Sequence, residues 1–137
     1  ADGQWDVTVG LLAEIDSVAR SHETPALFVL IPAPFQIDPA DLTRYVQAYG
    51  LDPASIDLEQ PNRILAERLG AEGIAVLDLL PDFRQAHEAG TRLYGAVDQH
   101  FTPEGNRLFA EVVTPAVVTL LSRDGALAAS GGGEASR

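Results

Sequence analysis

Residues 26–31 read Ala-Leu-Phe-Val-Leu-Ile, and residues 74–79 read Ile-Ala-Val-Leu-Asp-Leu. Both runs have the length of a strand and are almost wholly apolar, which is typical of strands that are covered on both faces. Pro32 and Pro34 end the first run, because proline cannot donate to a strand ladder. Helix-like segments alternate with the two runs, and this order predicts an α/β fold with a parallel sheet.

The segments around these runs carry helix signals. Residues 6–20 have apolar side chains at helical spacing, which predicts an inward face made of Val9, Leu11, Leu12, Ile15 and Val18. Asp38-Pro39-Ala40-Asp41 combines a cap, a proline and a first-turn acid, and it predicts a helix that stops at Gly50. Further helices are predicted from Pro61 to Gly70 or Gly73 and over residues 81–89, with one turn at Asp52-Pro53.

The longest predicted helix covers residues 103–122. Pro115 should kink it, because proline removes one helical hydrogen bond. We expect its inward face to contain Leu108, Phe109, Val112, Val113, Val117, Leu120 and Leu121. Residues 126–137 are mostly small and include three consecutive glycines, so we expect a flexible tail after one domain at residues 1–125.

The composition excludes several kinds of function. The formal net charge is −11 with a pI of about 4.4, so neither nucleic acid nor an anionic membrane is an expected partner. No apolar run approaches the roughly 18 residues of a membrane span. All nine basic residues are arginine, which excludes Schiff-base chemistry, and the absence of cysteine excludes thiol catalysis and disulfides. Since methionine is also absent, we expect a processed or excised chain.

The stretch from Tyr94 to Asn106 reads Tyr-Gly-Ala-Val-Asp-Gln-His-Phe-Thr-Pro-Glu-Gly-Asn. It places Asp98 and His100 two residues apart, just before a helix that opens with Thr102 as its cap. An imidazole near its ordinary pKa can accept a hydroxyl proton, and a carboxylate on its other nitrogen fixes the tautomer. This stretch is therefore the candidate catalytic site.

The order of strands, Asp98-x-His100-Phe101 and the following Thr-Pro-Glu-Gly-Asn resemble the C-terminal half of an SGNH (GDSL-type) hydrolase, over residues 5–119. The resemblance implies a three-layer, flavodoxin-like α/β fold that hydrolyses or transfers acyl groups on lipids or acylated sugars. It implies that His100 is the general base, that Asp98 orients it, and that no cofactor and no metal is needed. Relatives of this branch are often secreted or membrane-anchored.

The family nucleophile, a Gly-Asp-Ser segment, has no counterpart here, since serines 17, 21, 55, 122, 130 and 136 lie in other settings. Neither Asn62 nor Asn106 lies in a family oxyanion block. On this alignment the N-terminal half is missing, and we expect it from a companion chain, an unseen segment or a symmetric dimer. The chain is then part of a serine esterase or O-acyltransferase; the alternative is a non-catalytic remnant that keeps the fold for binding or assembly.

Other candidate residues have a functional and a structural interpretation. Phe35 follows a strand's carboxyl end and is a candidate substrate contact, or else an ordinary aromatic that anchors a turn. Phe101 is the other candidate substrate contact. Asp78 ends a strand, where it can face a crevice or accept from a neighbouring backbone amide. A metal site is the remaining alternative, with Asp98, His100 and either His87 or Glu88 as ligands. His22 and His87 are otherwise expected to be solvated.

Overall fold

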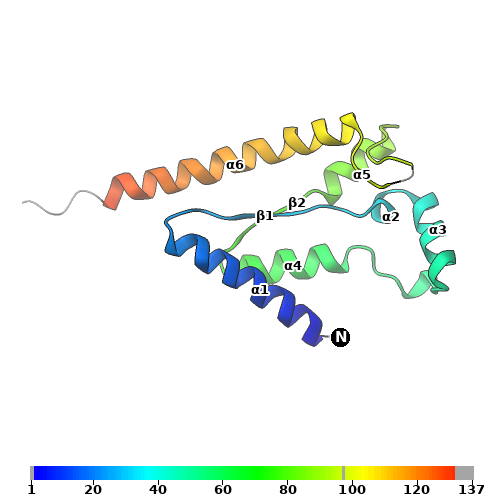
Figure 1. Ribbon diagram of the computed structural model, residues 1–137, viewed down its shortest axis with the longest axis horizontal. Helices are drawn as coiled ribbons and strands as arrows, with labels where there is room; N and C mark the ends of the chain where they lie inside the picture. The colour runs from blue at the N-terminus through cyan, green and yellow to red at the C-terminus, as the bar shows by residue number, and fades with distance from the viewer. Residues whose placement is uncertain (1, 97, 132–137) are drawn as a thin grey trace, which may run out of the picture.

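The computed structural model describes residues 2–96 and 98–131. Two short strands form the centre, and helices lie on both sides of them (Figure 1). In chain order the elements are α1 (Asp2–Ser21), β1 (Leu27–Leu30), α2 (Pro34–Ile37), α3 (Pro39–Tyr49), η1 (Pro53–Ser55), α4 (Gln60–Ala71), β2 (Ala75–Asp78), α5 (Leu80–Glu88) and α6 (Pro103–Gly131).

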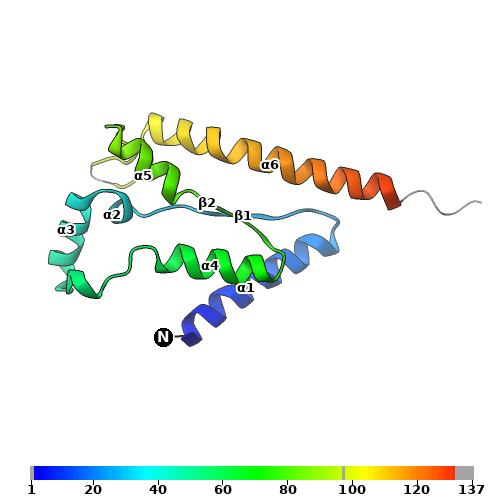
Figure 2. The same ribbon diagram turned by 180° about the vertical axis from the view of Figure 1, so that it is seen from behind.

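The two strands form a parallel sheet, in a register that pairs Leu27 with Ala75 and Leu30 with Asp78. Figure 2, the view from behind, agrees with Figure 1 that α6 runs along one side of the strands while α1 and α4 lie on the other. The predicted α/β architecture with strands between helical layers is therefore confirmed.

Each side of the sheet has its own hydrophobic core. Val29 and Leu77 point toward α6, and Phe28 and Val76 point toward α1 and α4, because successive side chains of a strand alternate between its faces. The core under α6 is built on Ile37, Leu79, Leu80, Phe83 and Leu93, and the core under α1 and α4 is built on Val9, Leu69 and Ile74.

Capping residues lie at the helix starts and ends that the sequence predicts. The Asp38 carboxylate accepts from the Ala40 amide at 2.7 Å at the start of α3, and Gly50 closes that helix with a φ of 61°. Asp52 caps the single turn of η1 in the same way. Residues 34–37, directly after the prolines that end the first strand, form the short helix α2, which was not predicted.

The predicted inward face of α1 is only partly right. Val9 is buried and Leu12 packs beside it, whereas Leu11, Ile15 and Val18 are exposed together with Val7. The buried side of α1 instead includes Asp16, whose carboxylate accepts from Nε of Arg20 at 2.5 Å. An ion pair thus occupies part of the buried side of α1, and several apolar side chains of the helix lie on its exposed side.

The last helix also differs from its prediction. It passes through Pro115 and continues beyond Ser122 to Gly131 (Figure 1). Its first half packs on the core through Leu108, Phe109, Val112 and Val113, but Val117 and Leu121 are exposed. Residues 126–131 of the predicted tail are thus helical, and residues 132–137 lie outside the described residues. In the part of the chain that the structure describes, no helix is long and apolar enough to cross a membrane.

Candidate active site

The candidate catalytic residues lie on a short hairpin between α5 and α6. Tyr94 and Phe101 form an isolated antiparallel bridge, in which the Gly95 amide donates to the His100 carbonyl at 2.8 Å. The Thr102 amide donates to the Leu93 carbonyl at 2.9 Å and continues the pairing. These backbone hydrogen bonds therefore close the loop that carries Asp98 and His100.

The start of α6 holds one end of this hairpin. Thr102 caps the helix as predicted: its hydroxyl accepts from the Gly105 amide at 3.1 Å and donates to the Arg92 carbonyl at 2.7 Å. Gly105 lies so close to the hairpin that a Cβ there would be 2.3 Å from the Leu93 carbonyl oxygen. Only glycine allows this approach between helix and hairpin.

Asp98 and His100 form a dyad, by which we mean these two side chains in contact. Nδ1 of His100 lies 3.1 Å from Oδ2 of Asp98, and the His100 backbone amide donates to Oδ1 at 3.3 Å. The intervening Gln99 adopts a left-handed conformation with a φ of 57°, which folds the loop back so that the two side chains meet. The backbone amide of His100, helped by its side chain, lowers the pKa of Asp98 below its usual value.

Both members of the dyad face outward. The side chain of His100 is 84% exposed and that of Asp98 is 64% exposed. With Nδ1 directed at Asp98, the other ring nitrogen, Nε2, is the atom left to take a proton from a nucleophile.

Tyr94 places the hairpin at the carboxyl end of the sheet. Its hydroxyl donates a hydrogen bond to the carbonyl of Pro32, which lies shortly after the end of β1. Burial raises the pKa of Tyr94 to about 12, so the phenol keeps its proton and remains a donor. Ligands of parallel α/β sheets gather at this end, where the chain leaves the strands.

Two adjoining pockets lie beside the hairpin; Gln99 lines both of them, whereas Asp98 and His100 line neither. The larger, of about 350 Å³, is formed by the hairpin, the end of α5 and the start of α3, and includes His87, Thr91 and Arg92. The smaller, of about 310 Å³, lies against α3 and includes Phe35, Tyr45 and Tyr49. They share Pro34, Asp41, Arg44 and Gln99, and we call the two together the groove.

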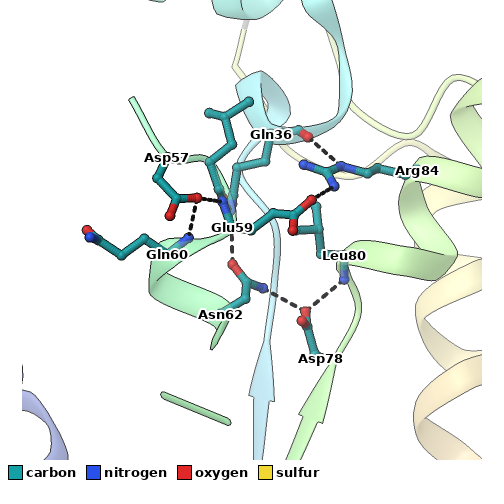
Figure 3. A network of polar contacts seen from close by, with 9 residues as sticks. Gln36, Asp57, Glu59, Gln60, Asn62, Asp78, Leu80 and Arg84 are labelled. Carbon is teal, nitrogen blue, oxygen red and sulfur yellow. Dashed lines mark hydrogen bonds and ion pairs between the residues drawn. The ribbon is translucent and has the colours of Figure 1, made fainter. Parts of the chain in front are cut away.

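A network of polar contacts fixes the same end of the sheet (Figure 3). Asn62 is buried, donates to Oδ1 of Asp78 at 2.6 Å and accepts from Gln36 at 3.0 Å. Arg84 donates to the Gln36 carbonyl at 3.0 Å and contacts Glu59. The network thus joins α2, α4, β2 and α5, and two of these elements, α2 and α5, contribute residues to the groove.

The side-chain carboxylates of Asp78 and Asp57 accept hydrogen bonds from backbone amides in this network. Oδ1 of Asp78 also accepts from the Leu80 amide at 2.9 Å, as the structural interpretation expects. Asp78 lines a separate pocket of about 240 Å³ as well, so it also faces a crevice. Asp57 accepts from the amides of Glu59 and Gln60 at the start of α4 (Figure 3). The Glu59 amide is the main cause that lowers the pKa of Asp57.

Of the two predicted substrate contacts, one lies in the groove and the other in the core. Phe35 lines the smaller pocket, as a substrate contact should. Phe101 packs against Phe83, Tyr94 and Phe109 in the core and lines neither pocket of the groove, so its substrate contact stays a prediction that the placement does not favour. Among residues 2–96 and 98–131 no three His, Asp or Glu side chains gather as a metal site would require.

Four residues that line the groove were not predicted from the sequence: Tyr45, Tyr49, Arg44 and Gln99. Tyr45 and Tyr49 lie four residues apart, a spacing that places them on one face of α3. The spacing of the two tyrosines is visible in the sequence. The facing wall of the smaller pocket comes from Gln99 of the hairpin, and only the fold brings α3 and the hairpin together.

Comparison with known proteins assigns the chain to a family. No curated protein and no solved structure matches the sequence. A family model does match, over residues 4–130, and its description is SGNH hydrolase-like domain, acetyltransferase AlgX. This match confirms the predicted SGNH resemblance and agrees with the parallel sheet between helices. The chain belongs to this family of SGNH hydrolase-like domains.

Proposed function

We propose that this chain supplies the base of a serine esterase or O-acyltransferase, with His100 as general base and Asp98 as the residue that orients it. The observation that carries the proposal is the 3.1 Å contact between Nδ1 of His100 and Asp98 on an imidazole that is otherwise open. A carboxylate in that position holds the proton on Nδ1, leaves Nε2 as the acceptor and stabilises the imidazolium that forms.

The reaction needs a serine hydroxyl beside Nε2. As the serine oxygen bonds to the acyl carbon of the ester, its proton moves to Nε2 of His100. The alcohol leaves with that proton when the tetrahedral intermediate collapses, and an acyl-serine remains. Water or a sugar hydroxyl then gives its proton to Nε2 and attacks the acyl carbon, and the serine oxygen leaves with that proton, which restores the neutral imidazole. Water makes the enzyme an esterase, and a sugar hydroxyl makes it an acyltransferase.

The proposed source of the serine is a polypeptide segment outside residues 1–137. No serine of this chain lies in a Gly-Asp-Ser setting, and both dyad side chains are exposed. A segment that brought the serine to Nε2 would also cover the dyad and exclude water, which strengthens its electrostatic contacts. The substrate in this proposal is an acyl ester of a carbohydrate or a lipid.

One feature supports the alternative of an assembly role. Val7, Leu11, Ile15 and Val18 make an exposed apolar stripe along α1, and apolar patches of this kind often mark contacts with a partner. The stripe lies on the opposite side of the sheet from α6 (Figure 1). A partner bound there is compatible with catalysis, so the stripe favours assembly without replacing the enzymatic proposal.

The test is the hydrolysis of p-nitrophenyl acetate by the protein in its native assembly. Replacing His100 by alanine should lower kcat/KM by about a thousandfold or more, because the serine then lacks its base. The control is His22→Ala, which removes an exposed imidazole beyond α1, far along the chain from the dyad, and should leave the rate unchanged. Equal rates for the His100 variant and the native protein would overturn the proposal.

A further inference from the structure

We propose that Tyr94 is a positioning residue for the reaction, and that its hydroxyl sets where His100 stands relative to the carboxyl end of β1. This inference deepens the proposed function and rests on it for the role of His100 as base. Tyr94 acts through the hairpin that carries the dyad and not on the reacting atoms. Loss of its hydroxyl should therefore lower the rate and leave the contact within the dyad as it is.

The position of His100 is determined by the hairpin. The ring contacts Asp98 of the same loop at 3.1 Å, and the side chain is 84% exposed. Among the described residues, the hydrogen bonds and ion pairs of His100 are made with Asp98 and Gly95 alone, and both belong to the hairpin. Any displacement of the hairpin therefore displaces the imidazole with it.

Two contacts tie the hairpin to different elements. The hydroxyl of Thr102 caps α6 and holds one side of the hairpin on that helix. The hydroxyl of Tyr94, on the other side, donates to the carbonyl of Pro32. Of the hydrogen bonds that residues 92–102 make within the described part of the chain, this one alone reaches the segment after β1. Without it, the hairpin would be hydrogen-bonded to α6 and not to the end of the sheet.

Tyr94 is closely connected to the backbone of His100. It lies opposite Phe101 in the antiparallel bridge, and the two ring centroids are 5.1 Å apart. Phe101 directly follows His100, and Gly95, the neighbour of Tyr94, donates to the His100 carbonyl at 2.8 Å. A shift of Tyr94 is thus transmitted to His100 through one ring contact and one backbone hydrogen bond.

The rate depends more steeply on this position than the stability does. A general base must come within about 2.6–3.2 Å of the hydroxyl whose proton it takes. A displacement of about 1 Å can lower the rate roughly a hundredfold, whereas one hydrogen bond adds little to the stability of a fold. The phenol remains a donor at neutral pH, because burial raises the pKa of Tyr94 to about 12.

The test is the hydrolysis of p-nitrophenyl acetate by the native assembly with Tyr94→Phe, well below the unfolding temperature. We expect kcat to fall roughly tenfold, because the shift is smaller than 1 Å, and KM to stay within about twofold. The midpoint of the pH–rate profile should not move, since His100 keeps its contact with Asp98. Ile74→Val is the matched control: it removes one buried methyl group from the core under α1 and α4, with a similarly small loss of stability and no change in kcat.

Each other outcome has a definite meaning. An unchanged kcat in Tyr94→Phe would overturn the inference, and so would an equal loss in Ile74→Val, because the effect would then come from stability alone. A change confined to KM would also overturn it and would assign Tyr94, which lines the larger pocket, to binding. If His100→Ala is inactive while Tyr94→Phe is fully active, this inference alone fails; if His100→Ala keeps its rate, the proposed function fails with it.

Discussion

The hydroxyl of Tyr94 donates a hydrogen bond to the carbonyl of Pro32, and this contact joins the hairpin that carries the dyad to the end of β1. The two residues are far apart in sequence, and the contact places His100 and Asp98 at the carboxyl end of the sheet. A single side-chain oxygen makes this contact, so one substitution tests it.

Tyr94→Phe should lower the free energy of unfolding by about 1 kcal/mol, because the Pro32 carbonyl loses its donor while the ring packing is kept. The folded-state pKa of about 12 lies above the ordinary tyrosine pKa of 10.0. The contribution of the neutral phenol is therefore complete below pH 10 and is lost as the pH rises toward 12. Urea unfolding between pH 8 and pH 11 should show this loss in the native chain and not in the variant; identical pH dependence would contradict it.

Gly105→Ala should destabilise the protein by roughly 1–3 kcal/mol or more, because the new Cβ would be 2.3 Å from the Leu93 carbonyl oxygen and the backbone must move. Gly10→Ala is the matched control, since it lies in α1 with nothing within 4 Å of the added Cβ. It should be neutral or stabilise by up to about 1 kcal/mol. Equal melting temperatures for the two variants would show that α6 does not pack this closely on the hairpin.

Gly95→Ala should disturb the dyad while leaving the fold intact. The added Cβ would lie 2.7 Å from Oδ1 of Asp98, an atom at the end of a side chain that can turn away. We expect the pKa of Asp98 to rise back toward the ordinary aspartate pKa of 3.8, since the carboxylate leaves its donors. Carbon NMR of the labelled carboxyl measures this pKa, and an unchanged value would contradict the geometry.

His100→Ala provides the comparison for that titration. The first cause of the lowered Asp98 pKa is the backbone amide of residue 100, which alanine retains. The pKa should therefore rise in part and remain below 3.8. A lowered carboxyl pKa stabilises the folded loop above the ordinary pKa, and this effect is lost as the pH falls through the lowered pKa. Both variants should therefore differ from the native chain in stability above pH 3.8, and the difference should disappear in acid.

Asn62→Ala should cost roughly 1.5–3 kcal/mol of stability, because the Asp78 carboxylate loses a donor at 2.6 Å in a half-buried site. Asn106→Ala is the matched control: that amide bonds the Thr102 carbonyl at 3.2 Å on the exposed side of α6, and its loss should change stability by less than about 0.5 kcal/mol. Thermal unfolding of the two variants measures the difference, and similar losses would mean that the network of Figure 3 is not a source of stability.

The sequence predicts the elements that local chemistry determines. Asp38 and Gly50 mark the ends of α3 because a cap and a left-handed glycine depend on near neighbours alone. The two apolar runs predict the parallel sheet because burial on both faces leaves no polar alternation. The contact between Asp98 and His100 could also be predicted from the sequence, since two residues of one loop can meet without the rest of the fold.

Features that depend on distant segments could not be predicted in the same way. Leu11, Ile15 and Val18 match a helical period as well as Val9 does, and only the packing of α1 on α4 decides which of them is buried. The groove has the same origin, because Tyr49 and Gln99 come from segments that the fold places side by side. Phe101 was expected near substrate from its motif, but its neighbours Phe83 and Phe109 hold it in the core.

The measurement that tests the central claim most directly is labelling of the native assembly with a fluorophosphonate, followed by identification of the labelled residue by mass spectrometry. The account predicts one labelled serine outside residues 1–137, with labelling that is lost in His100→Ala and kept in His22→Ala. Labelling that persists at full rate without the His100 imidazole would contradict the proposal that this chain supplies the base, and so would an assembly that carries no reactive serine.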